Sequence, residues 1–156
     1  MKTLVLLSII IFLNVSFAAE CSKEKTMKEV NRVCKEISTK GDAAKKVNLV
    51  FENCGKNYVW IQDASKPTLN MIVHPIKRRL NGKALDKHAD ENGKKLFVEF
   101  DKIAKKEKEK GGWVDYMWAK PGKEKATPKL SFVKLCEGKG VSWVAGSGIW
   151  KEDLKK

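Results

Sequence analysis

The sequence predicts an α+β domain in which a five-stranded antiparallel sheet carries helices on one face. Apolar residues recur at helical spacing in the first third of the 156-residue chain and again near residue 100. Five runs rich in aromatic and β-branched residues, separated by short turns, have the composition of strands. No internal repeat or long linker interrupts them, so we expect a single domain.

Three helices are expected, over residues 22–40, 43–54 and 94–108. Gly41 can end the first helix and Asp42 can cap the second. The third ends in a lysine-rich tail that complements the helix dipole. The apolar positions are Met27, Val30, Cys34 and Ile37 in the first, Ala43, Val47, Val50, Phe51 and Cys54 in the second, and Leu96, Phe97, Phe100, Ile103 and Ala104 in the third.

Two strands are expected between the second and third helices, and three after the third. Pro75 ends the second strand, because proline cannot continue a hydrogen-bonded ladder. Residues 121–128 form the expected loop between the third and fourth strands, and glycines turn the chain into the fifth. The runs are NYVWIQD (57–63), TLNMIVHP (68–75), WVDYMWA (113–119), KLSFVKLC (129–136) and VSWVAGSGIW (141–150).

The N-terminus has the pattern of a secretory signal peptide, residues 1–18, which leaves residues 19–156 as the domain. Lys2 is the positive n-region, and Leu4–Leu13 is almost wholly apolar. Small residues end the segment, so we expect cleavage after Ala18 and a periplasmic or secreted protein. An uncleaved membrane anchor is the alternative, although the apolar run is shorter than the roughly 20 residues that a span needs.

The composition favours anionic partners. The apolar fraction of 42% is ordinary for a globular protein, whereas 32 Lys+Arg against 19 Asp+Glu gives a formal net charge of +13. Such an excess attracts small carboxylates, nucleic acid or an acidic protein surface. Most of the charge is lysine spread along the chain, which is also the pattern of a solvated surface.

Four cysteines follow the signal segment, and an even number in an exported protein permits two disulfides by any of three pairings. Cys21 and Cys34 are placed on one helix, where 1.5 Å per residue separates them by roughly 20 Å, too far for a bridge. A structural disulfide is the favoured interpretation, and free buried thiols are the alternative. The other two cysteines are Cys54 and Cys136.

The order of motifs resembles a single Cache domain of the second type, a PAS-like extracytoplasmic sensor domain. The resemblance covers roughly residues 22–153. Family members have a long N-terminal helix packed behind the antiparallel sheet, while loops and a covering helix enclose a small-ligand pocket on the other face. The motifs are GKNYVWIQD, MIVHP, LNGKAL, DENGKKLFVEF, GGWVDYMWAKPG, KLSFV and WVAGSGIW.

The resemblance also implies a role in chemosensing and signal transduction. Such domains bind small organic molecules, often short carboxylates, and usually precede a transmembrane helix and a signalling module. Only IWKEDLKK follows Gly148, so we expect a free-standing sensor whose signal is read by a membrane-bound signalling protein. Trp150 replaces a commoner Tyr, Ala119 stands where Pro often occurs, and the cysteines are not part of the general pattern.

The predicted site lies in the 113–119 strand and the strand after it. Side chains alternate along a strand, so Tyr116 and Trp118 share one face while Trp113 points the other way. A Tyr hydroxyl can donate to a carboxylate, and a Trp supplies an apolar wall and one N–H. Lys129 opens the next strand and supplies the charge. From the residues alone, the favoured interpretation is that both tryptophans belong to the core and Lys129 lies on the surface, whereas the resemblance to Cache domains favours Tyr116 and Lys129 as ligand contacts.

His74 is a second candidate, because a strand-end histidine can donate to an anion and titrate near neutral pH. The alternative is a structural histidine bonded to the backbone. Tyr58, Trp60 and Met71 are expected to form core or pocket wall, as is Trp113, and these four complete the predicted ligand-binding set.

Enzymatic activity is not expected, because the chain has no nucleophile elbow, phosphate loop or paired-histidine metal motif. With only two histidines, no multi-histidine zinc site can form, and no cofactor or metal is predicted. The alternative function is binding of polyanions or an acidic partner surface. Export and the scarcity of arginine argue against a nucleic-acid partner. We therefore expect an exported domain that binds a small organic anion, a short carboxylate being favoured.

Overall fold

The computed structural model describes residues 21–53, 55–64 and 69–154. The predicted signal peptide, residues 1–18, lies outside these ranges. Within them, no helix combines the length and the apolar character needed to cross a bilayer.

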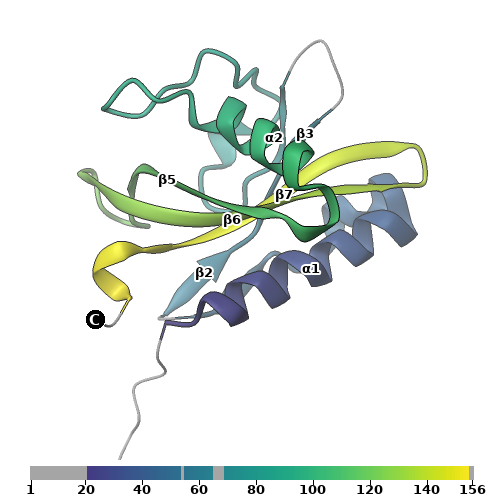
Figure 1. The fold of residues 1–156 in the computed structure, drawn as a ribbon, viewed down its shortest axis with the longest axis horizontal. Coiled ribbons are helices and arrows are strands. Elements are labelled where there is room, and N and C mark those ends of the chain that lie inside the picture. Colours follow the sequence, from purple (N-terminus) through teal and green to yellow (C-terminus); the bar gives the residue numbers. More distant parts are fainter. Residues whose placement is uncertain (1–20, 54, 65–68, 155–156) are drawn as a thin grey trace, which may run out of the picture.

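The main sheet has five antiparallel strands in the order β4-β3-β7-β6-β5, which confirms the predicted sheet (Figure 1). The last three strands form two long hairpins. The C-terminal strand, β7, lies in the centre of the sheet because it pairs with β6 on one side and with β3 on the other. A separate two-stranded ladder, β1-β2, precedes it. The bounds are β1 Val50–Glu52, β2 Lys56–Tyr58, β3 Trp60–Asp63, β4 Met71–Val73, β5 Gly112–Ala119, β6 Ala126–Gly138 and β7 Val141–Trp150.

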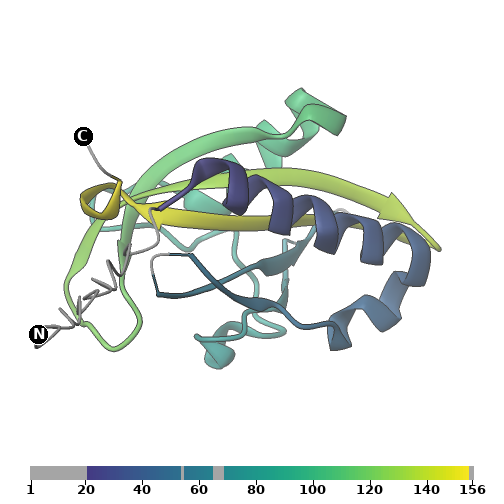
Figure 2. The ribbon, with the colours of Figure 1, turned by 90° about the horizontal axis from the view of Figure 1, so that it is seen from below.

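The two long helices lie on opposite faces of this sheet. α1 (Lys23–Lys40) packs along one face, and α2 (Leu96–Glu107) covers the other (Figures 1 and 2). The expectation from strand order that the helices share a face is therefore wrong. The layering implied by the family resemblance, with the N-terminal helix behind the sheet and a covering helix in front, is confirmed. Each face of the sheet is apolar, so each must be buried.

The helix predicted over 43–54 forms only in part. A 3-10 helix, η1, spans Gly41–Lys46, and the chain then extends into β1. The predicted 57–63 strand is divided at Val59, whose backbone N–H donates to the carbonyl of Leu49 at 2.8 Å. The β-branched and aromatic residues after η1 thus pair with β2, and this strand pairing overrides the helical spacing of their side chains.

The β5-β6 hairpin is longer than predicted, because β6 begins at Ala126. Its register places Tyr116 opposite Lys129 and Trp118 opposite Thr127. Lys129 is therefore the direct cross-strand partner of Tyr116 rather than a neighbour of Trp118. Alternation along β5 follows the prediction, since Tyr116 and Trp118 are both buried on one face.

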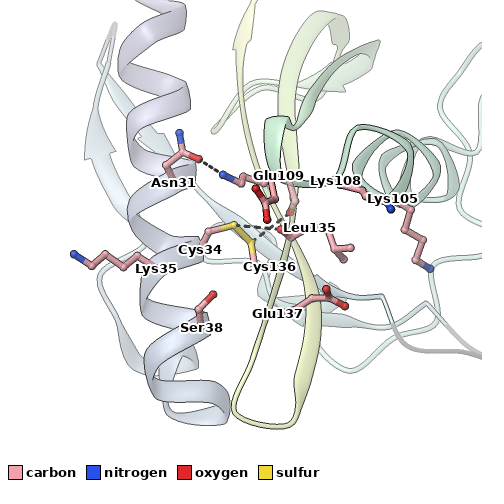
Figure 3. Close-up of a pocket in the computed structure, with 11 residues that line it drawn as sticks. Asn31, Cys34, Lys35, Ser38, Lys105, Lys108, Glu109, Leu135, Cys136 and Glu137 are labelled. Carbon is pink, nitrogen blue, oxygen red and sulfur yellow. Dashed lines mark hydrogen bonds between the residues drawn. A yellow bond between two sulfur atoms is a disulfide. The ribbon is translucent and has the colours of Figure 1, made fainter.

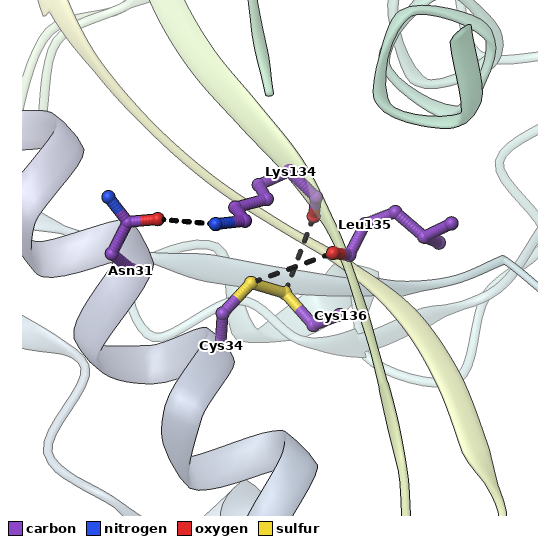
Figure 4. The surroundings of a disulfide bond; sticks show 5 residues. All are labelled: Asn31, Cys34, Lys134, Leu135 and Cys136. Carbon is purple, nitrogen blue, oxygen red and sulfur yellow. Dashed lines mark hydrogen bonds between the residues drawn. A yellow bond between two sulfur atoms is a disulfide. The ribbon is translucent and has the colours of Figure 1, made fainter. Parts of the chain in front are cut away.

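A disulfide joins Cys34 of α1 to Cys136 of β6, with the two Cα atoms 5.0 Å apart. It lies beside the cleft drawn in Figure 3, and Figure 4 shows its surroundings. Near it, Lys134 Nζ donates to Asn31 Oδ1 at 2.9 Å, so strand and helix are also joined by a hydrogen bond. Cys21 is disulfide-bonded as well. The expectation of a structural disulfide is confirmed.

Candidate functional site

Seven of the eight predicted site residues are brought together on the sheet face that α2 covers. Each of the seven is at most 7% exposed. They come from β2, β3, β4, the turn after β4, β5 and β6, so the site is a tertiary assembly. The seven are Tyr58, Trp60, Met71, His74, Tyr116, Trp118 and Lys129.

Trp113, the eighth residue, lies on the opposite face. Its ring packs against Phe132, with the centroids 5.4 Å apart, and Lys23 Nζ lies 5.6 Å from its centroid. It belongs to the apolar layer beneath α1. The structure therefore does not bring Trp113 to the other seven.

Lys129 is the centre of the assembly and has no exposed surface. Its ammonium donates to the hydroxyl oxygen of Tyr58 at 3.1 Å. It also lies 4.0 Å from the ring centroid of Trp150 and 4.5 Å from that of Tyr58. Gly148 leaves room for the side chain of Lys129, because a Cβ at position 148 would approach Lys129 Cε to 2.9 Å. The expected alternative, a surface Lys129, is excluded.

A positive charge on Lys129 would have no counter-ion among the described residues, since none of their carboxylates pairs with it. Burial lowers its pKa well below the usual lysine value, and repulsion by Lys77 lowers it further. Burying an ion in a protein costs several kcal/mol. A desolvated cation–π contact offsets about 2 kcal/mol of this, and a hydrogen bond to a charged group about 1.5–3 kcal/mol. These contacts leave the ammonium without the partner that a buried charge normally has.

Tyr58 is the shared hydrogen-bond acceptor of the site. Its hydroxyl oxygen accepts from Lys129 Nζ and, at 3.2 Å, from Trp118 Nε1. Burial raises the pKa of Tyr58 far above its ordinary value, so the group remains a phenol. A phenol that accepts two bonds keeps its own proton for donation. Ser147 Oγ fixes the backbone by donating to the Tyr58 carbonyl at 2.7 Å.

Tyr116 is fully engaged inside the site. Its hydroxyl is hydrogen-bonded to Ser131 Oγ at 3.0 Å, and its ring meets that of Phe100 edge-on with the centroids 4.9 Å apart. Burial raises the pKa of Tyr116 well above the usual range. Its hydroxyl is therefore a neutral group whose present partner is Ser131.

His74 is buried beside Tyr58, with the ring centroids 4.9 Å apart. Its Nδ1 accepts from the backbone N–H of Lys77 at 3.0 Å, so in the neutral ring the proton resides on Nε2. The backbone N–H of His74 donates to Asn81 Oδ1 at 2.7 Å. Burial, followed by Lys129 and Lys77, lowers the pKa of His74 to about 3. In the ligand-free protein it is neutral near pH 7, so the expectation that it titrates there is wrong.

The segment after β4 brings a second cation to the site. Lys77 Nζ lies 3.7 Å from the ring centroid of Trp118, and burial, then repulsion by Arg79, lowers the pKa of Lys77. His88 is partly buried against Phe97 and Trp118, and its ring centroid lies 5.4 Å from that of Phe97 and 5.9 Å from that of Trp118. Sequence reasoning did not identify Lys77 or Trp150 as members of the site.

Asp90 is used to hold the 86–94 turn in place. Its Oδ1 accepts from the backbone N–H groups of Asn92 and Lys94, and its Oδ2 accepts from that of Met117 at 2.9 Å. The carboxylate thus ties the turn to β5.

Trp60 adds another donor to the same face. Its Nε1 is buried and has no hydrogen-bond partner among the described residues. The ring lies over Gly146, where a Cβ would meet it, and packs against Phe100 with the centroids 5.1 Å apart. The free polar hydrogens of the site are thus on lysine, phenol, indole and imidazole groups. Such a set of donors is complementary to an anion.

A cleft of about 750 Å³ lies elsewhere, between α1, β6 and the end of α2 (Figure 3). It contains lysines, but Lys134 donates to Asn31 and Lys105 is paired with Asp101 at 2.8 Å. Carboxylates of Glu109 and Glu137 also line it. Two of the four lysines that line the cleft thus have a partner, and carboxylates lie among them, whereas none of the described carboxylates pairs with Lys129; we take the enclosed aromatic cluster as the candidate site.

Comparisons of sequence and of structure with known proteins point to the same family. Residues 23–156 match the sequence model of a family described as the Cache domain. The methyl-accepting chemotaxis protein McpP of Pseudomonas putida strain KT2440 is 31% identical over 99 residues, which is 64% of this chain and 17% of that protein. The chain thus spans less than a fifth of the length of this curated relative.

Solved structures agree in fold. A periplasmic sensor domain of a chemotaxis protein is similar at TM-score 0.61 and 29% identity, covering 82% of this chain and 89% of that one. A structure described as the basis for carboxylic acid recognition by a Cache chemosensory domain gives 0.63 and 28%, covering 82% and 92%. A methyl-accepting chemotaxis protein from Vibrio parahaemolyticus RIMD 2210633 gives 0.62 and 25%, covering 85% and 88%.

Proposed function

Because the chain belongs to the Cache domain family, we propose that it is an exported sensor domain that binds a small organic anion, a short carboxylate, at the cluster around Lys129. One observation carries this proposal: Lys129 is fully buried in an aromatic enclosure, and among the described residues no carboxylate neutralises it. A similar Cache chemosensory domain is described as recognising a carboxylic acid, which supports the same ligand class here.

In the proposed complex, the carboxylate takes the place of the missing counter-ion. An ammonium about 4 Å from a carboxylate gains roughly 4 kcal/mol at an effective dielectric of 20, before desolvation is subtracted. The hydroxyl of Tyr58 and Nε2–H of His74 are the proposed second donors, and Tyr116 contributes if its bond to Ser131 opens. Trp118, Trp60 and Met71 form the walls. The recognition is non-covalent, with no catalytic step.

Binding would act through a shift of conformation. Lys129 has no exposed surface, so a ligand reaches it only if the covering segments move. A state that closes around the carboxylate would be favoured by the ligand in proportion to its differential affinity for that state. We propose a periplasmic location, with residues 19–156 as the domain and a membrane-bound chemosensory protein as the reader.

A thermal-shift screen tests the proposal, with short mono- and dicarboxylates, amino acids and neutral amides as probes. We expect a carboxylate to raise the melting temperature while the amide of the same carbon skeleton does not. Lys129→Met should abolish the gain, and Tyr58→Phe should reduce it. The matched control is Lys134→Met on the same strand, which should leave the gain unchanged.

Two results would remove the proposal. One is undiminished carboxylate binding by Lys129→Met. The other is stabilisation only by polyanions such as heparin, with a steep dependence on salt that reflects the release of many counter-ions. The second result would favour a basic surface for acidic partners instead.

A further inference from the structure

We propose that Lys129 is uncharged in the ligand-free domain and takes a proton from solvent when a carboxylate binds, so that the domain recognises the anion and a proton together. The inference rests on the proposed function, which assigns the carboxylate to this site. It concerns how occupancy depends on pH as well as on ligand concentration.

The geometry offers the protonated amine little compensation. Lys129 has no exposed surface, and among the described residues its side chain has one hydrogen-bond partner, the neutral phenol of Tyr58. The remaining contacts are with the aromatic faces of Tyr58, Trp150 and, at 5.9 Å, Trp60. The amine form needs no counter-ion, whereas the ammonium form does.

None of the described titratable neighbours supplies a negative charge. Burial raises the pKa values of both tyrosines, so they stay neutral, and burial lowers that of His74, so it stays neutral too. Lys77 is a like charge that opposes protonation of Lys129. α2 presents apolar residues to this face, and β7 presents Gly148 and Trp150. The titratable groups are Tyr58 on β2, Tyr116 on β5, and His74 and Lys77 after β4.

The two carboxylates that follow Trp150 in the chain, Glu152 and Asp153, already have a cation. Lys120 Nζ pairs with Glu152 at 2.6 Å and with Asp153 at 2.7 Å, and lies 5.9 Å from the ring centroid of Trp150. These charges face one another and do not pair with Lys129.

A bound carboxylate changes this balance, because it supplies the counter-ion inside the enclosure. The amine, a solvent proton and the carboxylate anion then form an ammonium–carboxylate pair, and no covalent bond is made or broken. Where the free lysine is uncharged and the bound one charged, each rise of one pH unit weakens binding by up to about tenfold. The carboxyl group of the ligand is ionised near and above neutral pH, so it contributes nothing to the dependence of binding on pH.

Titration calorimetry tests the inference, with acetate, propionate and pyruvate as probes at about pH 8 in HEPES and in Tris. These buffers differ in ionisation enthalpy, so the difference in observed heat gives the number of protons taken up. We expect uptake approaching one proton per bound carboxylate, together with a dissociation constant that rises between about pH 7 and pH 9.

One measurement and one variant identify the group that takes the proton. In NMR spectra at about pH 8, the ring of His74 should stay neutral when the carboxylate binds, because His74 is not the acceptor. Lys77→Met should diminish it, because removing a nearby cation makes the free Lys129 easier to protonate.

The outcomes separate the two proposals. Carboxylate binding with equal heats in both buffers and a pH-independent dissociation constant would overturn proton uptake while leaving the proposed function standing. Protonation of the His74 ring on carboxylate binding would assign the proton to His74 and overturn it as well. If none of the three carboxylates binds, both proposals fall.

Discussion

Replacing Lys129 with Met should stabilise the ligand-free protein. Met keeps most of the side-chain length and removes an amine that is completely buried without a carboxylate partner among the described residues. Replacing buried charged groups with apolar ones of similar volume gains about 1–4 kcal/mol in other proteins. We expect about 2 kcal/mol at neutral pH, which raises the melting temperature of a domain of this size by roughly 4–8 °C.

The gain should shrink as pH rises, because the folded state of the parent protein holds Lys129 at a lowered pKa. Between the folded and unfolded pKa values the unfolded chain binds the extra proton, so the parent protein becomes more stable with increasing pH. The slope is at most about 1.4 kcal/mol per pH unit for one group. Lys129→Met lacks this contribution. The free energies of unfolding of the two proteins should therefore approach each other as the pH rises towards the ordinary pKa of lysine.

Urea unfolding of both proteins at several pH values between about 7 and 10 measures the effect. The control is Lys134→Met, whose parent side chain is hydrogen-bonded to Asn31 near the protein surface. If Lys129→Met is less stable than the parent at pH 7 and has the same pH dependence, the charge of Lys129 is compensated in the folded state and the reasoning is wrong.

Three further predictions follow from other contacts. Gly148→Ala should cost about 1–3 kcal/mol in urea unfolding, because the new Cβ would lie 2.6 Å from the carbonyl oxygen of Leu130; an unchanged midpoint would contradict the close approach. The double replacement Cys34→Ser and Cys136→Ser opens a bridge between residues 102 positions apart and should cost about 2–5 kcal/mol, measured under oxidising conditions against the disulfide-bonded parent protein. The ring of His74 should show no NMR titration near pH 6.5, whereas its contribution to stability is lost as pH falls from its unfolded pKa towards about 3, since only the unfolded imidazole takes up the proton there. A midpoint near 6.5 for this ring would contradict its burial.

The parts of the fold that depend on local periodicity were predictable from the sequence. Alternation along β5 placed Tyr116 and Trp118 on one face, and apolar spacing identified α1 and α2. The 43–54 segment was not predictable in this way, because its helical spacing competes with pairing to β2, a contact between separate segments. Local rules describe preferences, and tertiary pairing decides between them.

The burial of Lys129 was beyond such rules for the same reason. A lysine in a β-strand is ordinarily a surface residue. Here the space for it is created by Gly148 on the neighbouring strand, and its hydrogen-bond acceptor, Tyr58, comes from β2. Lys129 became a candidate through the family resemblance. That none of the described carboxylates pairs with it could be seen only once the strands were assembled into the sheet.

The Cys34–Cys136 bridge has a mechanical consequence for this domain. Cys136 and Lys129 belong to the same strand, seven positions apart by number and thus about 23 Å along an extended chain. A covalent tether at that distance prevents the N-terminal helix from sliding past the strand that carries the lysine. Any relative motion of helix and strand must therefore keep the two joined at this point.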